Sequence, residues 1–377
     1  MRGARARHLW RNQNVIHLCG DLATRASTIG RTSCVLVLLG TLISLVTGCS
    51  GSEAPARPDL STEIRYANAY GQYRSLVYVP GTVHPERPAP MVVVLHGANT
   101  TAEQQRAANL FDPLAARERF IVMYPDHETD RALGRHPLQA WRFYNPAEMQ
   151  RDVGDTQAIA ELTRQAMATW NVDPERVYII GMSAGGWMTS IMGATYPDLY
   201  AAIGIAEAGA YGIGLAGLAQ PLGPALLRPE LLALAAHQAM GTHARVLPVI
   251  NFQGDNDAAA TPASGAHAVQ QWLMTNNLAA SGSLYVPFPL APTETIAVTP
   301  AGGYPYHIDI YRDANGCRIL EQVRIEQMAH YWPGGSDDPS LAGFTDPQAP
   351  SGAELSWAFF KRFRRSDTAL SCVEFRQ

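Results

Sequence analysis

Continuous apolar runs recur along the chain and predict strands that are buried on both faces. Stretches that alternate apolar and polar residues predict half-exposed strands instead. The continuous runs occupy residues 91–95, 120–125, 177–180, 201–206 and 246–252. The alternating stretches lie at 64–70 and 74–80, which form a predicted antiparallel hairpin, and at 306–311 and 320–326.

Segments with helical periodicity separate most of these runs. Predicted helices occupy residues 101–118, 152–170, 230–240, 262–278 and 351–364. Strands that alternate with helices predict an α/β fold with a mostly parallel central sheet, helices on both faces, and ligands bound at the carboxyl ends of the strands. The Gly-, Leu- and Ala-rich segment 209–244 is interpreted as an insertion over that edge, either a lid or packed surface helix.

The run at 177–180 leads into a Gly-x-Ser-x-Gly motif from Gly181 to Gly185, and a helical pattern of small residues follows. A strand, a tight turn and a helix predict a nucleophile elbow, with the hydroxyl of Ser183 at the carboxyl end of a parallel strand. The two glycines are needed because a Cβ in this turn would collide with neighbouring backbone. The alternative is a Gly/Ser-rich turn that carries no chemistry.

A serine nucleophile needs a histidine base, and that base needs an acid to fix its tautomer. In this kind of fold the chain order is Ser, then acid, then His. His330 is the late histidine that directly follows a predicted strand, so it is the predicted base. Asp255 and Asp257 both follow the strand at 246–252. Asp257 is favoured because it lies further into the loop, and helix capping is the alternative role for both.

The oxyanion hole needs two backbone N–H donors near the serine. Ala184 opens the helix after the elbow and is predicted to supply one. The loop after the strand at 91–95 is predicted to supply the other, from Ala98 or Asn99. Two tryptophans are candidates for lining an acyl pocket, with core packing as the alternative: Trp332, two residues after His330, and Trp141 in the loop 126–150.

Composition and the amino-terminal segment indicate where the protein is located and which partners it lacks. The chain has 377 residues, 47% of them hydrophobic, and a net charge of −4, so no nucleic-acid partner is expected. Residues 1–49 have the layout of a secretory signal whose ending resembles a lipobox at Cys49, and an ordinary secretory signal with a coincidental cysteine is the alternative. We therefore expect residues 50–62 to form a flexible tether, and 63–368 to form a secreted catalytic domain held to the bacterial envelope by a lipid on Cys49.

Cys317 and Cys372 are the cysteines that follow Cys49 in the sequence. A disulfide between them is one expectation for an oxidising compartment, and two free thiols are the alternative. No cluster has metal-ligand spacing, and no glycine-rich loop is suited to cradling a phosphate. The sequence therefore predicts neither a metal nor a cofactor, and it leaves the oligomeric state open.

With these residues identified, the chain resembles the polyhydroxybutyrate depolymerase family of esterases, close to feruloyl and acetylxylan esterases. The resemblance implies an α/β-hydrolase fold and assigns the triad to Ser183, Asp257 and His330. The matching stretches are Leu95-His-Gly with Thr101-Ala-Glu, Tyr124-Pro-Asp, 177–186, 194–202, Gly254-x-x-Asp257, His330-x-Trp332-Pro-Gly-Gly and Phe344-Thr-Asp-Pro.

The function expected from this resemblance is hydrolysis of short-chain (hydroxy)acyl esters by a serine esterase. No linker and polymer-binding module follow residue 368, which favours short esters and soluble oligomers over crystalline polymer. The alternative within the enzyme class is a feruloyl or acetylxylan esterase that acts on plant polysaccharide. A non-catalytic surface binding module is the alternative outside it.

Overall fold

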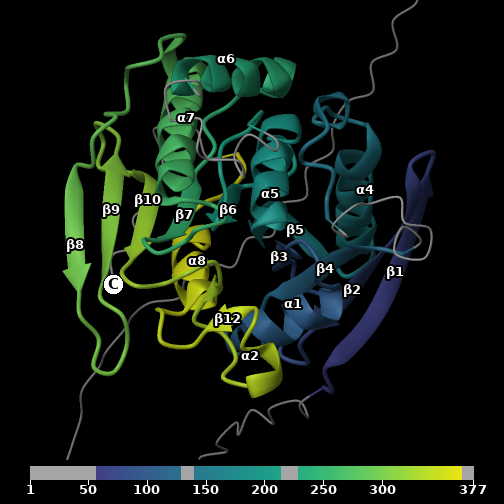
Figure 1. Cartoon of the computed structure of the whole chain (residues 1–377). Coiled ribbons are helices and arrows are strands. Elements are labelled where there is room, and N and C mark those ends of the chain that lie inside the picture. The colour runs from purple at the N-terminus through teal and green to yellow at the C-terminus, as the bar shows by residue number, and fades with distance from the viewer. Residues whose placement is uncertain (1–56, 129–139, 214–227, 367–377) are drawn as a thin grey trace, which may run out of the picture. The chain divides into compact units, whose positions relative to one another are not determined.

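The computed structural model describes residues 57–128, 140–213 and 228–366. Within them, a sheet has the strand order β1-β2-β4-β3-β5-β6-β7-β10-β9-β8 (Figure 1). The predicted strands are confirmed, with boundaries that shift by a few residues. The strands of this sheet are β1 (Leu60–Asn68), β2 (Gly71–Val79), β3 (Ala89–Leu95), β4 (Ile121–His127), β5 (Val172–Met182), β6 (Ala202–Ala206), β7 (Val249–Gly254), β8 (Glu294–Val298), β9 (Tyr306–Arg312) and β10 (Arg318–Ile325).

The centre of the sheet is parallel, and its edges are antiparallel. Neighbours from β4 through β3, β5, β6 and β7 to β10 run parallel. The hairpin of β1 and β2 closes one edge, and β9 and β8 close the other. This arrangement confirms the mostly parallel sheet that the apolar runs predict, because a parallel strand needs both faces covered.

Helices cover both faces of the sheet and create two separate cores. Along β3, Met91 and Val93 belong to one core while Val92 and Val94 belong to the other, so the continuous apolar run serves both. Figure 1 shows the helices on the two sides. Helices α4 (Gly154–Thr169), α5 (Ala184–Thr195), α6 (Pro229–Met240) and α7 (Pro262–Ser281) contribute to the first core, and α1 (Ala102–Asn109), α2 (Phe111–Glu118) and α8 (Gly352–Phe360) contribute to the second.

Two local predictions need correction. The single helix expected at 101–118 is two helices, because Leu110 adopts a left-handed conformation with φ +61° that ends α1 and starts α2. The sequence reading also missed the edge strand β8 (Glu294–Val298), whose residues are exposed or only half-buried. The capping box at Thr101 is present, since its side chain accepts the backbone N–H of Gln104 and the Gln104 side chain accepts that of Thr101.

The carboxyl ends of β5, β6, β7 and β10 meet at one edge of the sheet, and loops from these ends carry most of the residues singled out from the sequence. Helix α6 confirms the helical pattern within 209–244, while residues 214–227 lie outside the described part. In the described residues, no helix is both long enough and apolar enough to cross a membrane. The described residues all belong to one compact unit, and the domain boundaries 63–368 stay a prediction.

Candidate active site

The Gly-x-Ser-x-Gly motif forms a sharp turn between β5 and α5. Ser183 has φ +55° and ψ −122°, a strained conformation for a residue with a side chain, and α5 begins at Ala184. A Cβ on Gly181 would lie 2.3 Å from the carbonyl oxygen of Gly185, so the two glycines permit the close approach. The backbone N–H of Ser183 donates to Ala206 at 2.9 Å, which ties the turn to the end of β6.

Three side chains from distant parts of the chain meet at this turn. Nε2 of His330 lies 2.8 Å from Oγ of Ser183, and Nδ1 of His330 lies 2.7 Å from Oδ2 of Asp257. Because Nδ1 faces a carboxylate, it carries the ring proton and leaves Nε2 free to accept the serine hydroxyl. The arrangement suits proton transfer from serine to histidine.

Asp257 is buried, while the side chain of His330 keeps 25% of its surface exposed. Oδ1 of Asp257 accepts the backbone N–H groups of Ala259 at 2.7 Å and Ala260 at 2.8 Å. Burial alone would raise the pKa of Asp257, but hydrogen bonds from His330 and Glu207 outweigh it and hold that pKa below its usual value. Asp257 is therefore charged at neutral pH.

Asp255, the alternative acid, has a different partner. Its Oδ1 accepts the backbone N–H of Gln327 at 2.6 Å, and its own N–H donates to Ile325 at 3.0 Å. Asp255 thus joins the end of β7 to the loop that leads to His330, and the structure brings Asp257 rather than Asp255 to the histidine.

The loop that follows β3 lies beside the serine. A Cβ on Gly97 would be 3.5 Å from both the Ser183 Cβ and the Met182 carbonyl oxygen. Ala98 is half-buried, and Asn99 is exposed with φ +57°. The loop and the start of α5 therefore flank the Ser183 side chain, as an oxyanion hole requires. Which N–H groups donate, among those of Ala184, Ala98 and Asn99, stays a prediction.

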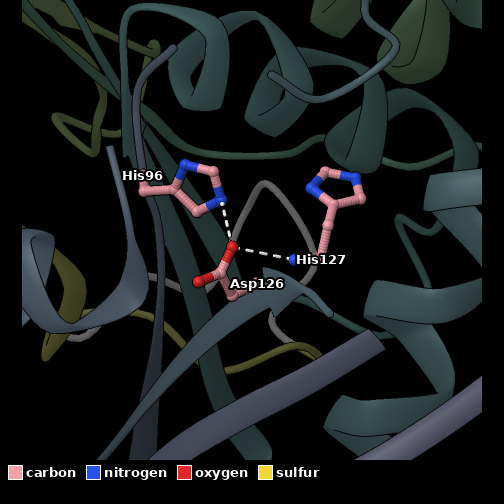
Figure 2. A group of neighbouring side chains, drawn as sticks. All are labelled: His96, Asp126 and His127. Atoms are coloured by element: carbon pink, nitrogen blue, oxygen red, sulfur yellow. Dashed lines mark hydrogen bonds and ion pairs between the residues drawn. The ribbon is translucent and has the colours of Figure 1, made fainter. Parts of the chain in front are cut away.

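A buried polar cluster supports this loop. Nδ1 of His96 donates to the carbonyl oxygen of Gly97 at 2.8 Å, and its Nε2 lies 3.2 Å from Oδ1 of Asp126 (Figure 2). The same oxygen of Asp126 accepts the backbone N–H of His127 at 2.8 Å. Trp141 donates its indole N–H to the carbonyl oxygen of His96 at 3.1 Å. These contacts fix the backbone carbonyl groups of His96 and Gly97, at the start of the loop.

Oxygen and nitrogen atoms of His96, Asp126 and His127 lie within 4.8 Å of one another, which is the spacing of a potential metal site. However, Oδ2 of Asp126 accepts Arg74 and the backbone N–H of Ala102, each at 3.1 Å. These N–H donors occupy lone pairs that a cation would need, so the cluster suits a hydrogen-bonded support better than a metal centre.

A second buried carboxylate, Asp155 at the start of α4, extends the cluster. It accepts the Tyr73 hydroxyl at 2.9 Å and the backbone N–H of Arg142 at 2.6 Å, and it lies 3.3 Å from Nε2 of His127. Burial alone would raise the pKa of Asp155, but the interactions with His127 and Arg142 outweigh it, and the pKa lies below the usual range. Asp155 thus anchors the segment that carries Trp141.

The two predicted pocket tryptophans are both buried. Trp141 has no exposed surface, and its ring packs on those of His96 and His127. Trp332 is 1% exposed and packs against Phe111. Their contact with a substrate stays a prediction.

Sequence reasoning missed Glu207, which is fully buried directly after β6 and is hydrogen-bonded to Asp257. The feature of the sequence that could have pointed to Glu207 is its place as a single acidic residue between two alanines at the end of an apolar run.

Cys317 is buried and disulfide-bonded. Its predicted partner, Cys372, lies outside the described residues, as does Cys49. The pairing of Cys317 with Cys372 therefore stays a prediction.

The fold has a clear counterpart among solved structures. An acetyl xylan esterase from Aspergillus awamori superposes with a TM-score of 0.60 at 19% identity, covering 80% of this chain and 99% of that one. This likeness confirms the α/β-hydrolase fold.

Sequence comparison adds relatives of two kinds. Poly(3-hydroxyalkanoate) depolymerase C of Paucimonas lemoignei is 26% identical over 249 residues, which cover 65% of this chain and 55% of the relative. An acetylxylan esterase of Coprinopsis cinerea is 29% identical over 271 residues, covering 68% and 66%. The chain thus spans between about half and two thirds of the length of these relatives. The family model described as esterase PHB depolymerase matches residues 73–278, and the chain belongs to that family.

Proposed function

We propose that this protein is a serine esterase that hydrolyses short-chain (hydroxy)acyl esters through an acyl-enzyme. The observation that carries the proposal is the continuous hydrogen-bonded chain from Ser183 through His330 to Asp257, with separations of 2.8 Å and 2.7 Å. This geometry meets the requirement for activating a serine hydroxyl, because the base is within reach and its tautomer is fixed.

Each residue has one role in the proposed reaction. Oγ of Ser183 attacks the ester carbonyl while Nε2 of His330 takes its proton, and Asp257 stabilises the imidazolium that forms. Backbone N–H groups of Ala184 and of Ala98 or Asn99 hold the oxyanion. His330 returns the proton to the leaving alcohol. Water then attacks the acyl-enzyme with His330 again as the base, which releases the acid and restores Ser183.

The family and the relative named as a poly(3-hydroxyalkanoate) depolymerase support the proposed substrate class. Acetylxylan esters are the rival substrates, because the Coprinopsis relative and the Aspergillus structure carry that name. Rates on 3-hydroxybutyrate oligomers, acetylated xylo-oligosaccharides and methyl ferulate separate these possibilities. Faster release of acetate or ferulate would overturn the hydroxyacyl preference while leaving the esterase mechanism intact.

The mechanism is tested with purified full-length protein and p-nitrophenyl butyrate. Ser183→Ala is expected to lose at least about 10³-fold in kcat, because Oγ is the attacking atom. Ser340→Ala is the matched control, since Ser340 is exposed and bonds only locally, to Asp338. A fluorophosphonate probe should label the parent protein and not Ser183→Ala. A folded parent that neither labels nor hydrolyses would favour the binding-module alternative.

We also propose export and lipid anchoring through Cys49, on the strength of the apolar segment and the lipobox-like ending before it. The test is membrane fractionation of cells that express the parent protein or Cys49→Ser. The substitution should release the protein from the membrane fraction, and retention of Cys49→Ser there would count against lipidation.

A further inference from the structure

Carboxyl oxygens of Glu207 and Asp257 lie within 4.8 Å of each other, and Glu207 has no exposed surface. It follows the last residue of β6 with φ +45°, a conformation that costs energy for any residue with a side chain, and its backbone N–H donates to Phe252 at 3.0 Å. Its Oε1 accepts the backbone N–H of Gly254 at 2.8 Å, and its Oε2 accepts the side-chain amide of Gln253 at 3.1 Å. The end of β7 thus holds this carboxyl group in place.

Glu207 and Asp257 form a buried carboxyl pair. Oxygen atoms of the two residues and a ring nitrogen of His330 lie within 4.8 Å of one another, and Glu207 is hydrogen-bonded to Asp257. Two carboxylates this close cannot both be ionised in a buried site, so the pair shares one proton. Two carboxyl oxygens form a hydrogen bond only when one of them carries that proton.

The surroundings decide which residue holds the proton. Asp257 accepts a ring N–H from His330 and two backbone N–H groups, from Ala259 and Ala260, and all three favour its charged form. Burial, followed by the hydrogen bond to Asp257 and its charge, raises the pKa of Glu207 well above its usual value. Glu207 is therefore the neutral, proton-donating partner.

A bound cation is the alternative to a shared proton, because Glu207, Asp257 and His330 also have ligand-like spacing. Both ring nitrogens of His330 already have partners, and N–H groups from Gly254 and Gln253 point at the Glu207 carboxyl. Such donors repel a cation, so the geometry favours the proton.

We propose that Glu207 is a positioning residue of the hydrolytic relay, and this proposal rests on the esterase function proposed above. Its protonated carboxyl donates a hydrogen bond to Asp257, holds that carboxylate in line with Nδ1 of His330, and limits how strongly the carboxylate stabilises the imidazolium. The relay then has four members: Ser183, His330, Asp257 and Glu207.

If Glu207 is neutral, replacing it should shift the pH profile of kcat/KM in a defined direction. Removing its donor concentrates negative charge on Asp257, so the imidazolium of His330 becomes more stable. The acid limb of the pH profile of kcat/KM, which reports loss of the base form, then moves to higher pH. If Glu207 were instead a second negative charge, its neutralisation would move the same limb to lower pH. Asp257 and His330 are the described titratable groups that act on Glu207.

Two variants of similar length test the proposal in the full-length protein, with p-nitrophenyl butyrate between about pH 5 and 9. Glu207→Gln keeps a donor for Asp257 and an acceptor for Gly254, so kcat should stay within about 3-fold and the acid limb should not move. Glu207→Met removes the donor, so kcat should fall about 10- to 100-fold, the loss expected for one charge-assisted hydrogen bond. KM should stay unchanged, because the residue is fully buried.

Glu321→Met is the matched control. Glu321 lies on β10 and is also buried, but its carboxylate pairs with Arg362. It should lower the melting temperature without moving the pH profile. A shift of the acid limb to lower pH in Glu207→Gln would overturn the proposal even if Glu207→Met fails to fold. A folded Glu207→Met with parental kcat and pH profile would overturn it as well.

Ser183→Ala, assayed in parallel, distinguishes failure of the proposed esterase function from failure of the proposed role of Glu207. An active Ser183→Ala overturns the proposed function and this proposal together. An inactive Ser183→Ala beside an unaltered Glu207→Met overturns only the role of Glu207.

Discussion

The carbonyl oxygen of Met328 lies where a side chain at position 254 would begin, because a Cβ on Gly254 would come within 2.2 Å of it. The same carbonyl accepts the backbone N–H of Asn256 at 3.1 Å. The end of β7, which leads to Asp257, is thereby packed directly on the segment that leads to His330. The distance between acid and base is set by backbone contact, not only by the side chains.

Gly254→Ala should therefore lower activity, although residue 254 is not one of the proposed catalytic residues. The added methyl group must push the 328–330 segment away, and a displacement of about 1 Å at a catalytic group costs on the order of 10²-fold in kcat/KM. Hydrolysis of p-nitrophenyl butyrate and the melting temperature are the measurements. Gly343→Ala is the matched control, since a Cβ there meets nothing within 4 Å. Equal loss in both variants would show that the Met328 contact is unimportant.

The contact between Gly254 and Met328 illustrates which features of the site could be predicted from the sequence and which could not. Ser183, Asp257 and His330 could be predicted from local signals, since each follows a predicted strand and they occur in the chain order of this fold. The contact of Gly254 with Met328 joins positions far apart in the sequence. Nothing in the residues around either one indicates that they touch.

Glu207 was missed for the same reason. Its local signal is a single acidic residue after a strand, which resembles ordinary helix capping or a solvated turn. Its role depends on Asp257, which reaches it only because β6 and β7 are neighbours in the sheet. The edge strand β8 was missed because its exposed residues lack the alternation that burial imposes.

Trp141 offers a test between support and substrate contact. Its indole N–H donates to the His96 carbonyl oxygen, next to the loop with the predicted oxyanion donors. Trp141→Phe keeps the ring packing but leaves that buried carbonyl without this donor. We expect kcat to fall about 10-fold with KM nearly constant, as expected for loss of about one hydrogen bond.

Trp272→Phe is the control for this experiment, because Trp272 is equally buried and donates to Ser190 at 3.1 Å in the core beneath α5. It should cost stability without a comparable loss of kcat. A rise in KM that grows with acyl-chain length in Trp141→Phe would instead support the predicted contact of Trp141 with substrate.

Cys372→Ser tests the predicted disulfide partner of Cys317. Cys317 is disulfide-bonded in the structure, and a bridge to Cys372 would close a long loop, worth about 4 kcal/mol in the chain-entropy model. The variant should therefore melt at a lower temperature under non-reducing conditions. Reducing agent should remove most of the difference. Non-reducing peptide mapping of the parent protein gives the direct check, and a linked peptide without residue 372 would contradict the pairing.

The pH dependence of stability tests the protonation of Glu207 without any assay of activity. The raised pKa means that the folded protein keeps a proton that the unfolded chain releases above its ordinary value of 4.5. The unfolded chain then binds fewer protons, so this group makes the free energy of unfolding fall as pH rises above that value, by about 1.4 kcal/mol per pH unit until the folded group ionises. Glu207→Gln does not titrate and lacks this slope.

Urea unfolding of both proteins at several pH values between about 5 and 8 measures the difference. Asp257 does not contribute a slope in this range, because its pKa is 3.8 when unfolded and lower when folded. The free energy of unfolding of Glu207→Gln, relative to that of the parent protein, should therefore increase steadily with pH. Parallel curves would mean that Glu207 gains no proton on folding in this range, and a relative decrease would mean that the folded protein releases a proton there.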